Sequence, residues 1–298
     1  MDFIVADLEW NGAYTAKAHG YFNEIIEIGA VKLDDRMEPT DSFHAVVRPV
    51  VSTKLSTIVK DLTSITPEEL ETGMPFSQAV SRMRKWAGGD SVLLTWSTTD
   101  LLVLMENCRY FLGTEKIPFM SRYADLQAYC QWRTGVGSSQ QIGLSKACEL
   151  LGIPEDGMDL HRALDDSRLT AEVLRHVYEP DSFGEWMKPA DEKFYERLNF
   201  KTTIINDIES PLIKRSDLLF RCDSCGRNLK RAGEWRFRNR AFCADFACRG
   251  CGKEYVGRVQ CKLKYEGVET KRRLSERVKP SKEEAVPAEE KVPIQEKG

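Results

Sequence analysis

The chain has 298 residues, of which 42% are hydrophobic and 30% are charged, so it is long enough for one good-sized folded domain and a smaller one. No apolar run approaches the length of a membrane-spanning helix, and we expect no membrane partner. The net charge of -3 conceals an asymmetry, because residues 1–210 hold 21 basic and 33 acidic side chains, whereas residues 211–279 hold 19 and 8.

This division of charge suggests a metal-binding body joined to an appendage that binds polyanions. Six of the nine cysteines lie between Cys222 and Cys261, and the start of the chain lacks the charged and long apolar regions of a signal peptide. Together these features indicate a cytoplasmic protein with a metal site rather than a secreted protein with disulfides.

The first predicted element is a buried strand within Phe3–Asn11, in which four apolar residues precede Asp7 and Glu9. Positions two apart share a face of a strand, so the two carboxylates project the same way. Adjacent carboxylates repel each other unless a cation lies between them, and oxygen clusters suit magnesium or manganese. The alternative is an acidic strand end that faces solvent, which these nine residues alone would favour.

The next elements predict an α/β fold. Two further strands with a short turn between them indicate an antiparallel meander, and the strands and helices that follow indicate a mixed sheet with helices on its faces. The expected elements are strands Glu24–Leu33, Phe43–Arg48 and Ser91–Trp96, a fifth strand within Tyr123–Trp132, and helices at Phe76–Trp86, after Ser97, at Gly143–Leu151 and at Arg162–Tyr178.

Two more carboxylates are candidates for a metal site. Asp100 follows a strand and opens a helix, where α/β folds build their sites, although it could equally cap that helix. Asp166 lies in the last helix of this part of the chain, and its neighbour Asp165 is a rival. His161 precedes Asp166 by five residues, so the two converge only if His161 lies on the loop that enters the helix.

These residues, in this order, resemble the three motifs of the DEDDh 3′-5′ exonucleases, which have an RNase H-like fold. The likeness covers roughly residues 1–178 and is carried by several short stretches. They are Asp7-x-Glu9, Asp100 after a strand, His161-x-x-x-x-Asp166, and the connecting phrases Glu24–Val31, Val47–Val50, Leu55–Ser56 and Leu62–Thr66, which resemble the Eri-type and KapD-type branch.

The resemblance implies a two-metal-ion 3′-5′ exonuclease that releases nucleoside 5′-monophosphates from RNA or single-stranded nucleic acid, with RNA favoured over DNA. Asp7, Glu9, Asp100 and Asp166 would bind two Mg²⁺ or Mn²⁺ ions, and His161 would be the general base. The stretch before Asp100 is polar, whereas many relatives have Asn and Phe there.

Substrate contacts are also implied next to the first motif. Trp10 and Asn11 stand where relatives often place groups that touch the substrate. Trp10 either stacks on the terminal base or closes the core.

Two pairs of cysteines resemble a zinc ribbon. Cys222, Cys225, Cys248 and Cys251 form two C-x-x-C-Gly turns, and four thiolates match the tetrahedral coordination of one structural Zn²⁺. Cys243 is an alternative zinc ligand, and it would most directly replace Cys248.

Basic residues alternate along two predicted strands of this ribbon. Arg236, Arg238 and Arg240 share one face, and Lys262 and Lys264 share another. If the two strands pair with these faces aligned, the ribbon presents a positive strip that contacts phosphates without sequence specificity. The alternatives are a solvated face or a surface that binds a protein partner.

The sequence therefore predicts four segments. They are an exonuclease domain at 1–182, a connector at 183–217, a zinc ribbon at 218–267 and a disordered charged tail at 268–298. The competing function is a catalytically inactive regulator that binds nucleic acid through the basic ribbon.

Overall fold

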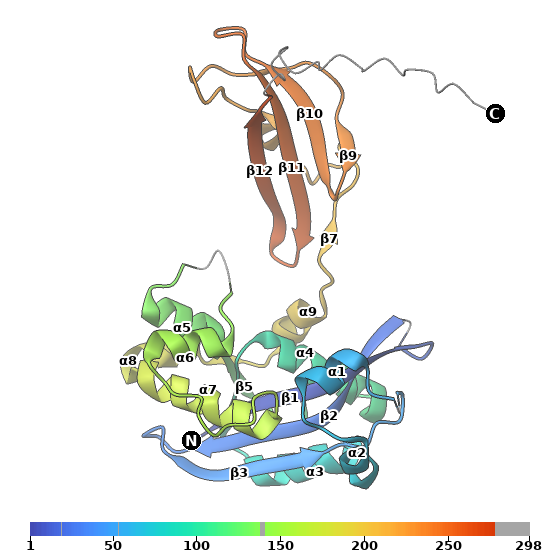
Figure 1. The fold of residues 1–298 in the computed structure, drawn as a ribbon, viewed down its shortest axis with the longest axis vertical. Coiled ribbons are helices and arrows are strands. Elements are labelled where there is room, and N and C mark those ends of the chain that lie inside the picture. Colours follow the sequence, from blue (N-terminus) through green and yellow to red (C-terminus); the bar gives the residue numbers. More distant parts are fainter. Residues whose placement is uncertain (19, 53, 138–140, 278–298) are drawn as a thin grey trace, which may run out of the picture. The chain divides into compact units, whose positions relative to one another are not determined.

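The computed structural model describes residues 1–18, 20–52, 54–137 and 141–277, which form two compact units (Figure 1). The first unit is Met1–Asn199 and the second begins at Phe200. No helix in these described ranges is both long and apolar enough to cross a membrane.

The first unit is built on a mixed sheet of six strands in the order β3-β2-β1-β4-β5-β6. The first three strands form the predicted antiparallel meander, and β4 and β5 run parallel to β1. The α/β fold class is therefore confirmed. The strands are β1 (Asp2–Thr15), β2 (Gly20–Leu33), β3 (Pro39–Val46), β4 (Ser91–Thr95), β5 (Arg122–Asp125) and β6 (Lys188–Pro189).

Helices cover both faces of this sheet. Phe3 and Val5 of β1 pack against α5, α6 and α7, whereas Ile4 and Leu8 pack against α3 and α4 on the opposite face. The helices are α1 (Thr57–Leu62), α2 (Pro67–Thr72), α3 (Phe76–Ala87), α4 (Thr98–Asn107), α5 (Leu126–Thr134), α6 (Leu144–Leu151), α7 (Ala163–Val177), α8 (Pro180–Phe183) and α9 (Glu192–Asn199).

The predicted fifth strand is shorter than its range suggested. Asp125 ends β5 and caps α5, because its carboxylate accepts a hydrogen bond from the backbone N–H of Ala128. Most of Tyr123–Trp132 is therefore helical.

Helix α7 approaches the sheet closely at Gly29 of β2. A Cβ on Gly29 would lie 2.1 Å from the carbonyl carbon of Ala163, the first residue of α7. Ser167 adds a hydrogen bond from its hydroxyl to the carbonyl oxygen of Gly29. Only glycine permits this contact, and it brings the start of α7 against the sheet.

The first unit extends beyond the predicted boundary at residue 182. Helix α9 buries Phe194 and Tyr195 in the core beside α3 and α4, and the Tyr195 hydroxyl accepts a hydrogen bond from the backbone of Ile117. Residues 183–199 of the predicted connector thus fold onto the first sheet.

The second unit is a separate antiparallel sheet in the order β12-β11-β10-β8, with β7 paired to β11 and β9 to β10. One face packs into a core that includes Phe220, Phe242, Phe246 and Tyr255. The strands are β7 (Thr203–Ile204), β8 (Lys230–Arg231), β9 (Arg236–Arg238), β10 (Ala241–Ala247), β11 (Glu254–Lys264) and β12 (Gly267–Glu276).

Strand β12 corrects the prediction of a disordered tail from residue 268. It pairs with β11 over ten residues, and Val268 and Leu274 pack against the core. The prediction failed because the many charged residues of this segment make its sequence look too polar to fold. Only one face of an antiparallel strand needs to be apolar, however. The part of the predicted tail at 278–298 lies outside the described residues.

Candidate active site

Strand β1 places the first two carboxylates, and the start of α4 places the third. Asp7 and Glu9 pair with Gly29 and Glu27 of β2, and the register shifts directly after Glu9. Asp100 lies in the first turn of α4 and accepts a hydrogen bond from the backbone of Leu8, the residue between Asp7 and Glu9. Asp100 is therefore held beside the first motif, although it comes from a distant part of the chain.

His161 lies on the loop before α7, as its spacing from Asp166 requires. Its backbone is left-handed, with φ of 66°, and its N–H donates to the Asp166 carboxylate at 3.2 Å. Ligand atoms of Glu9, His161 and Asp166 all lie within 4.8 Å of one another. Asp165, the rival of Asp166, instead pairs with Arg168 at 2.8 Å.

The electrostatics of the four carboxylates fit a site for divalent cations. Burial, followed by repulsion from Asp100 and Asp166, raises the pKa of Asp7 well above its usual range. Burial and repulsion from Asp166 raise the pKa of Glu9 to about 8. Burial also raises the pKa of Asp166, and it raises that of Asp100 to about 7. Such a group ionises fully near neutral pH only when cations offset the repulsion, and carboxylate oxygens are the ligands that Mg²⁺ and Mn²⁺ prefer.

A fifth buried carboxylate, Glu27, behaves differently. Burial alone would raise its pKa, but hydrogen bonds from His44, Arg162 and the backbone of Ala163 outweigh that effect and lower it. The Arg162 guanidinium donates to Glu27 at 2.7 Å and 3.0 Å, and the Ala163 N–H donates at 2.9 Å. Glu27 is thus an anion that fixes the first residues of α7 to β2.

Arg162 also fixes the loop that contains His161. Its guanidinium contacts Glu69 of α2 at 3.2 Å, and the nearby Ser64 hydroxyl donates to Asp159 at 2.6 Å. The positions of His161 and Asp166 therefore depend on Glu27 and Arg162. Sequence reasoning missed both residues, although a glutamate with Ile25, Ile26 and Ile28 around it in a predicted strand was a usable signal.

Trp10 and Asn11, the two residues after the first motif, differ in their burial and contacts. Asn11 is fully buried, donates to the Lys54 carbonyl and accepts from the Ser56 N–H, both at 3.0 Å. The Asn11 amide is thus engaged by the loop before α1, and contact between Asn11 and the substrate stays a prediction. Trp10 is partly buried against the core of α3 and α4, which agrees with the core-closing alternative.

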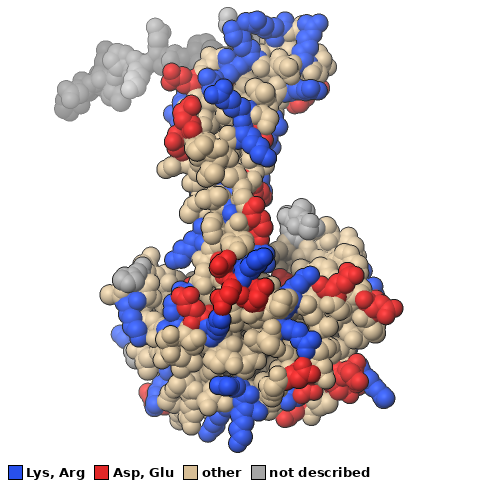
Figure 2. Space-filling view, turned by 180° about the vertical axis from the view of Figure 1, so that it is seen from behind, with Lys and Arg blue, Asp and Glu red and all other residues tan. Residues whose placement is uncertain are grey.

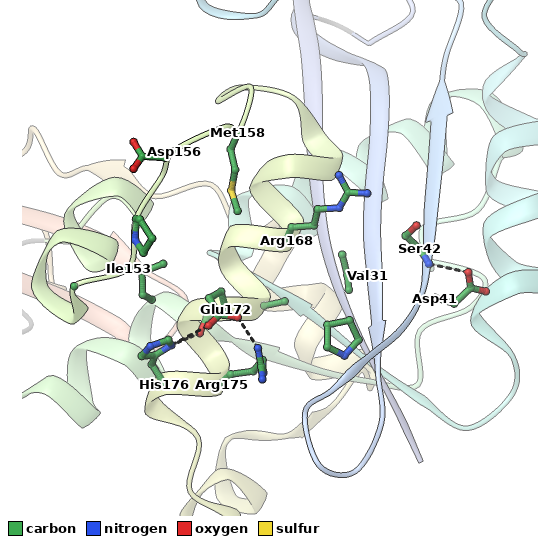
Figure 3. A pocket seen from close by; sticks show the side chains of 14 residues that line it. Val31, Asp41, Ser42, Ile153, Asp156, Met158, Arg168, Glu172, Arg175 and His176 are labelled. Carbon is green, nitrogen blue, oxygen red and sulfur yellow. Dashed lines mark hydrogen bonds and ion pairs between the residues drawn. The ribbon is translucent and has the colours of Figure 1, made fainter.

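A separate cavity of about 800 Å³ lies between α7, the α6–α7 loop and β3 (Figure 3). Three of the ionisable residues that line it, Glu172, Arg175 and His176, form ion pairs with one another. Arg175 contacts Glu38 and Glu172, and His176 contacts Glu172. The cavity contains none of the four site carboxylates and is not part of the candidate active site.

In the second unit, four cysteines form a cluster that could hold a metal ion. Their sulfur atoms lie within 4.8 Å of one another, and they are Cys222, Cys225, Cys248 and Cys251. Gly226 and Gly252, which follow the second cysteine of each turn, have φ of 73° and 74°, as tight turns require. Cys243 lies outside this cluster, on β10 opposite Arg258 of β11.

The environment of the cluster favours the thiolate form at two of its four cysteines, whereas desolvation and hydrogen bonds with the neighbouring thiols raise the pKa of Cys251 to about 11 and also raise that of Cys225. A hydrogen bond with the Tyr255 hydroxyl lowers the pKa of Cys222 to about 6, and hydrogen bonds from the backbone of Cys251 and Gly250 lower that of Cys248. The thiolate is the form of cysteine that binds metals.

The predicted basic strip is only partly correct. Strand β10 separates β9 from β11, so the two basic strands do not pair with each other. Arg236 and Arg238 lie exposed on β9, but Arg240 lies in the β9–β10 turn with φ of 60° and leaves their face. Lys264 is an ion-pair partner of Glu269, and Lys262 lies opposite that same residue.

Comparisons with known proteins identify the family of this chain. A family model described as Exonuclease matches residues 4–174. The chain is 29% identical to the probable 3′-5′ exonuclease KapD of Bacillus subtilis, with 62% of this chain and 89% of KapD covered. It is 32% identical to ERI1 exoribonuclease 2 of Mus musculus, with 56% and 27% covered.

One solved structure is also similar. It is the nuclease domain of 3′hExo, a DEDDh family member bound to rAMP, with a TM-score of 0.50, 26% identity, and coverage of 58% of this chain and 90% of that one.

The raised carboxylate pKa values predict how stability depends on pH. The pKa of Glu9 rises from 4.5 to about 8 on folding, so its contribution to stability is present below about pH 4.5 and is lost as the pH rises toward 8. Without Mg²⁺ or Mn²⁺, the midpoint of thermal unfolding should fall over this interval, and Mg²⁺ should raise it by several degrees at pH 8. Glu9→Gln should flatten both responses, whereas Glu172→Gln should leave them unchanged. An equal Mg²⁺ shift in Glu9→Gln would contradict this account.

Substitution of Arg162 separates positioning from simple electrostatics. Arg162→Gln removes a positive charge near the site, which by charge alone would tighten cation binding. Because Arg162 fixes the loop with His161 and the start of α7, we expect the opposite, a loss of Mn²⁺ affinity of about 10–100-fold. Electron paramagnetic resonance of free Mn²⁺ measures this affinity. Arg168→Gln, whose partner is Asp165, is the control, and tighter binding by Arg162→Gln would show that charge dominates.

Proposed function

The chain belongs to the exonuclease family and is a DEDDh 3′-5′ exonuclease, and from this premise we propose that it uses two divalent metal ions to remove nucleoside 5′-monophosphates from the 3′ end of RNA. The observation that supports the proposal most strongly is the convergence of Asp7, Glu9 and Asp166 with His161, with Asp100 hydrogen-bonded beside them.

In this proposal the carboxylates bind metal and His161 transfers a proton. Asp7, Glu9, Asp100 and Asp166 would hold two Mg²⁺ or Mn²⁺ ions, which when bound activate water and stabilise the leaving 3′ oxygen. His161 is exposed at the site, and an imidazole accepts a proton near neutral pH. His161 would take the proton of the water that attacks the terminal phosphorus, while the bond from that phosphorus to the 3′ oxygen breaks.

RNA is the preferred substrate in this proposal. One similar relative is named an exoribonuclease, and the similar nuclease domain of 3′hExo was solved with rAMP bound. Single-stranded DNA is the second candidate substrate. The competing function, an inactive regulator, is disfavoured because all four carboxylates and His161 are present in the arrangement described above.

We further propose that Cys222, Cys225, Cys248 and Cys251 bind one structural Zn²⁺ in the second unit. The cluster supports this assignment, and so do the hydrogen bonds that favour the thiolates of Cys222 and Cys248. Cysteine ligands of a metal must stay reduced, so this assignment goes with a reducing compartment such as the cytoplasm.

A labelled oligonucleotide tests the proposed reaction. The protein is incubated with 5′-labelled single-stranded RNA, or with DNA of the same sequence, in the presence of Mn²⁺ or Mg²⁺. We expect a ladder that shortens from the 3′ end, faster on RNA. Asp7→Ala should abolish it, and His161→Ala should slow it about 10²–10⁴-fold, the usual contribution of a general base. Glu172→Gln, outside the site, should be fully active, and wild-type protein that binds RNA without shortening it would overturn the proposal.

The zinc assignment has a matched control in the same strand region. Purified protein should contain one zinc ion per chain, and Cys248→Ser should lose that ion and lower the stability of the second unit. Cys243→Ser should keep it, because Cys243 lies outside the cluster. Zinc content by atomic emission decides between them, and loss of zinc in Cys243→Ser alone would reassign the ligand.

A further inference from the structure

The outer face of the second sheet, opposite its apolar core, carries a row of three arginines. Arg236 of β9 pairs with Cys243 of β10, Cys243 pairs with Arg258 of β11, and Arg258 pairs with Arg273 of β12. Residues that pair directly across strands share a face of the sheet. We call Arg236, Arg258 and Arg273 the arginine row.

Neighbouring side chains extend the row into a basic face. Arg238 lies two residues from Arg236, and Lys271 lies two residues from Arg273, so each shares the face of its neighbour. Lys271, Arg273, Arg236 and Arg238 are all exposed. Figure 2 shows many Lys and Arg side chains on the second unit.

The acidic residues of this face offset only part of its charge. Asp245 contacts Arg236 at 3.2 Å and also Arg277, and Glu269 contacts Lys264 at 2.5 Å and Lys271 at 3.6 Å. Among the residues that the structure describes, Arg238 and Arg273 have no acidic partner. Among the described residues, the uncompensated charge therefore lies at Arg258 and Arg273 of the row and at Arg238 beside it, whereas Arg236, Lys264 and Lys271 have ion-pair partners.

This arrangement is not explained by the stability of the sheet. Arg258 and Arg273 are directly opposite each other, and like charges in that position destabilise paired strands. Arg258 is held in place by a hydrogen bond of 2.6 Å from its guanidinium to the Asn239 carbonyl. A bound anion would offset the repulsion, and arginine forks match the oxygens of phosphate.

The shape and composition of the face indicate which anion. Strands lie about 4.7–4.9 Å apart, so a row across four strands spans about 14 Å, too long for one phosphate ion. None of the outward residues that β9 to β12 contribute is aromatic, so the face offers charge but no surface for stacking bases. Both features favour a nucleic acid backbone.

We propose that the arginine row, with Arg238 and Lys271, binds the sugar-phosphate backbone of the RNA that the first unit degrades. This inference rests on the proposed function, and it assigns the second unit the role of supplying affinity without sequence specificity. It replaces the predicted strip, because Arg258, Arg273 and Lys271 were not among the predicted contacts and Lys264 is neutralised.

The test compares the row with its neutralised neighbour. Binding of fluorescein-labelled single-stranded RNA is measured by anisotropy over a series of salt concentrations, with Asp7→Ala added throughout to prevent cleavage. Arg258→Gln with Arg273→Gln should weaken binding at least about tenfold and reduce the slope of log K against log salt by about 1.4, because each phosphate contact contributes about 0.7 for a single strand. Lys264→Gln is the matched control and should change neither quantity. Unchanged affinity and slope in the double variant would overturn the proposal and favour a protein partner.

Two further measurements serve as controls. The first shows whether the double variant is folded, and the second shows whether the proposed reaction takes place. Equal zinc content and circular dichroism spectra show that the double variant is folded. Without the Asp7 substitution, the double variant should hydrolyse the p-nitrophenyl ester of thymidine 5′-monophosphate at the wild-type rate but should show a raised KM on long RNA. If the wild-type chain cleaves neither substrate while the row still determines RNA affinity, the proposed reaction fails and the surface stands.

Discussion

Repulsion among four carboxylates is the constraint on which the first unit depends. The fold must bring Asp7, Glu9, Asp100 and Asp166 together and bury most of their surface, which raises the pKa of each. Local contacts offset this cost. Glycine at position 29 lets α7 reach the sheet, and the capped start of α4 brings Asp100 to the backbone of Leu8.

Glu27 shows why a buried carboxylate need not be a metal ligand. It lies beside Glu9 across the strands, but Arg162 and His44 neutralise it and its pKa falls. The four site carboxylates receive no comparable set of cationic partners from the described residues, since the largest lowering effects on them are hydrogen bonds from the backbone and the charges of His161 and Arg162. Two kinds of buried acid therefore share one region. One kind fixes the scaffold, and the other remains available to cations.

The sequence predicted those features that depend on local periodicity. Alternation in one strand placed Asp7 and Glu9 on one face, and the spacing of His161 and Asp166 required the loop that the structure contains. It did not predict those features that depend on long-range pairing. Asn11 is committed to residues more than forty positions away, and β12 is a strand because β11 and the core beneath it accept its apolar face. The turn that removes Arg240 from its strand has no glycine to mark it, since Asn239 and Arg240 themselves adopt positive φ.

The two units carry net charges of opposite sign. Residues 1–199 hold 20 basic and 31 acidic side chains, and this net negative charge disfavours the approach of a polyanion. Residues 200–277 hold 19 basic and 10 acidic side chains, and their arginine row gathers part of that excess on one sheet face. A net negative charge favours metal cations but disfavours a nucleic acid substrate. In the proposal above, a basic unit in the same chain supplies affinity for the substrate without altering the geometry of the carboxylates.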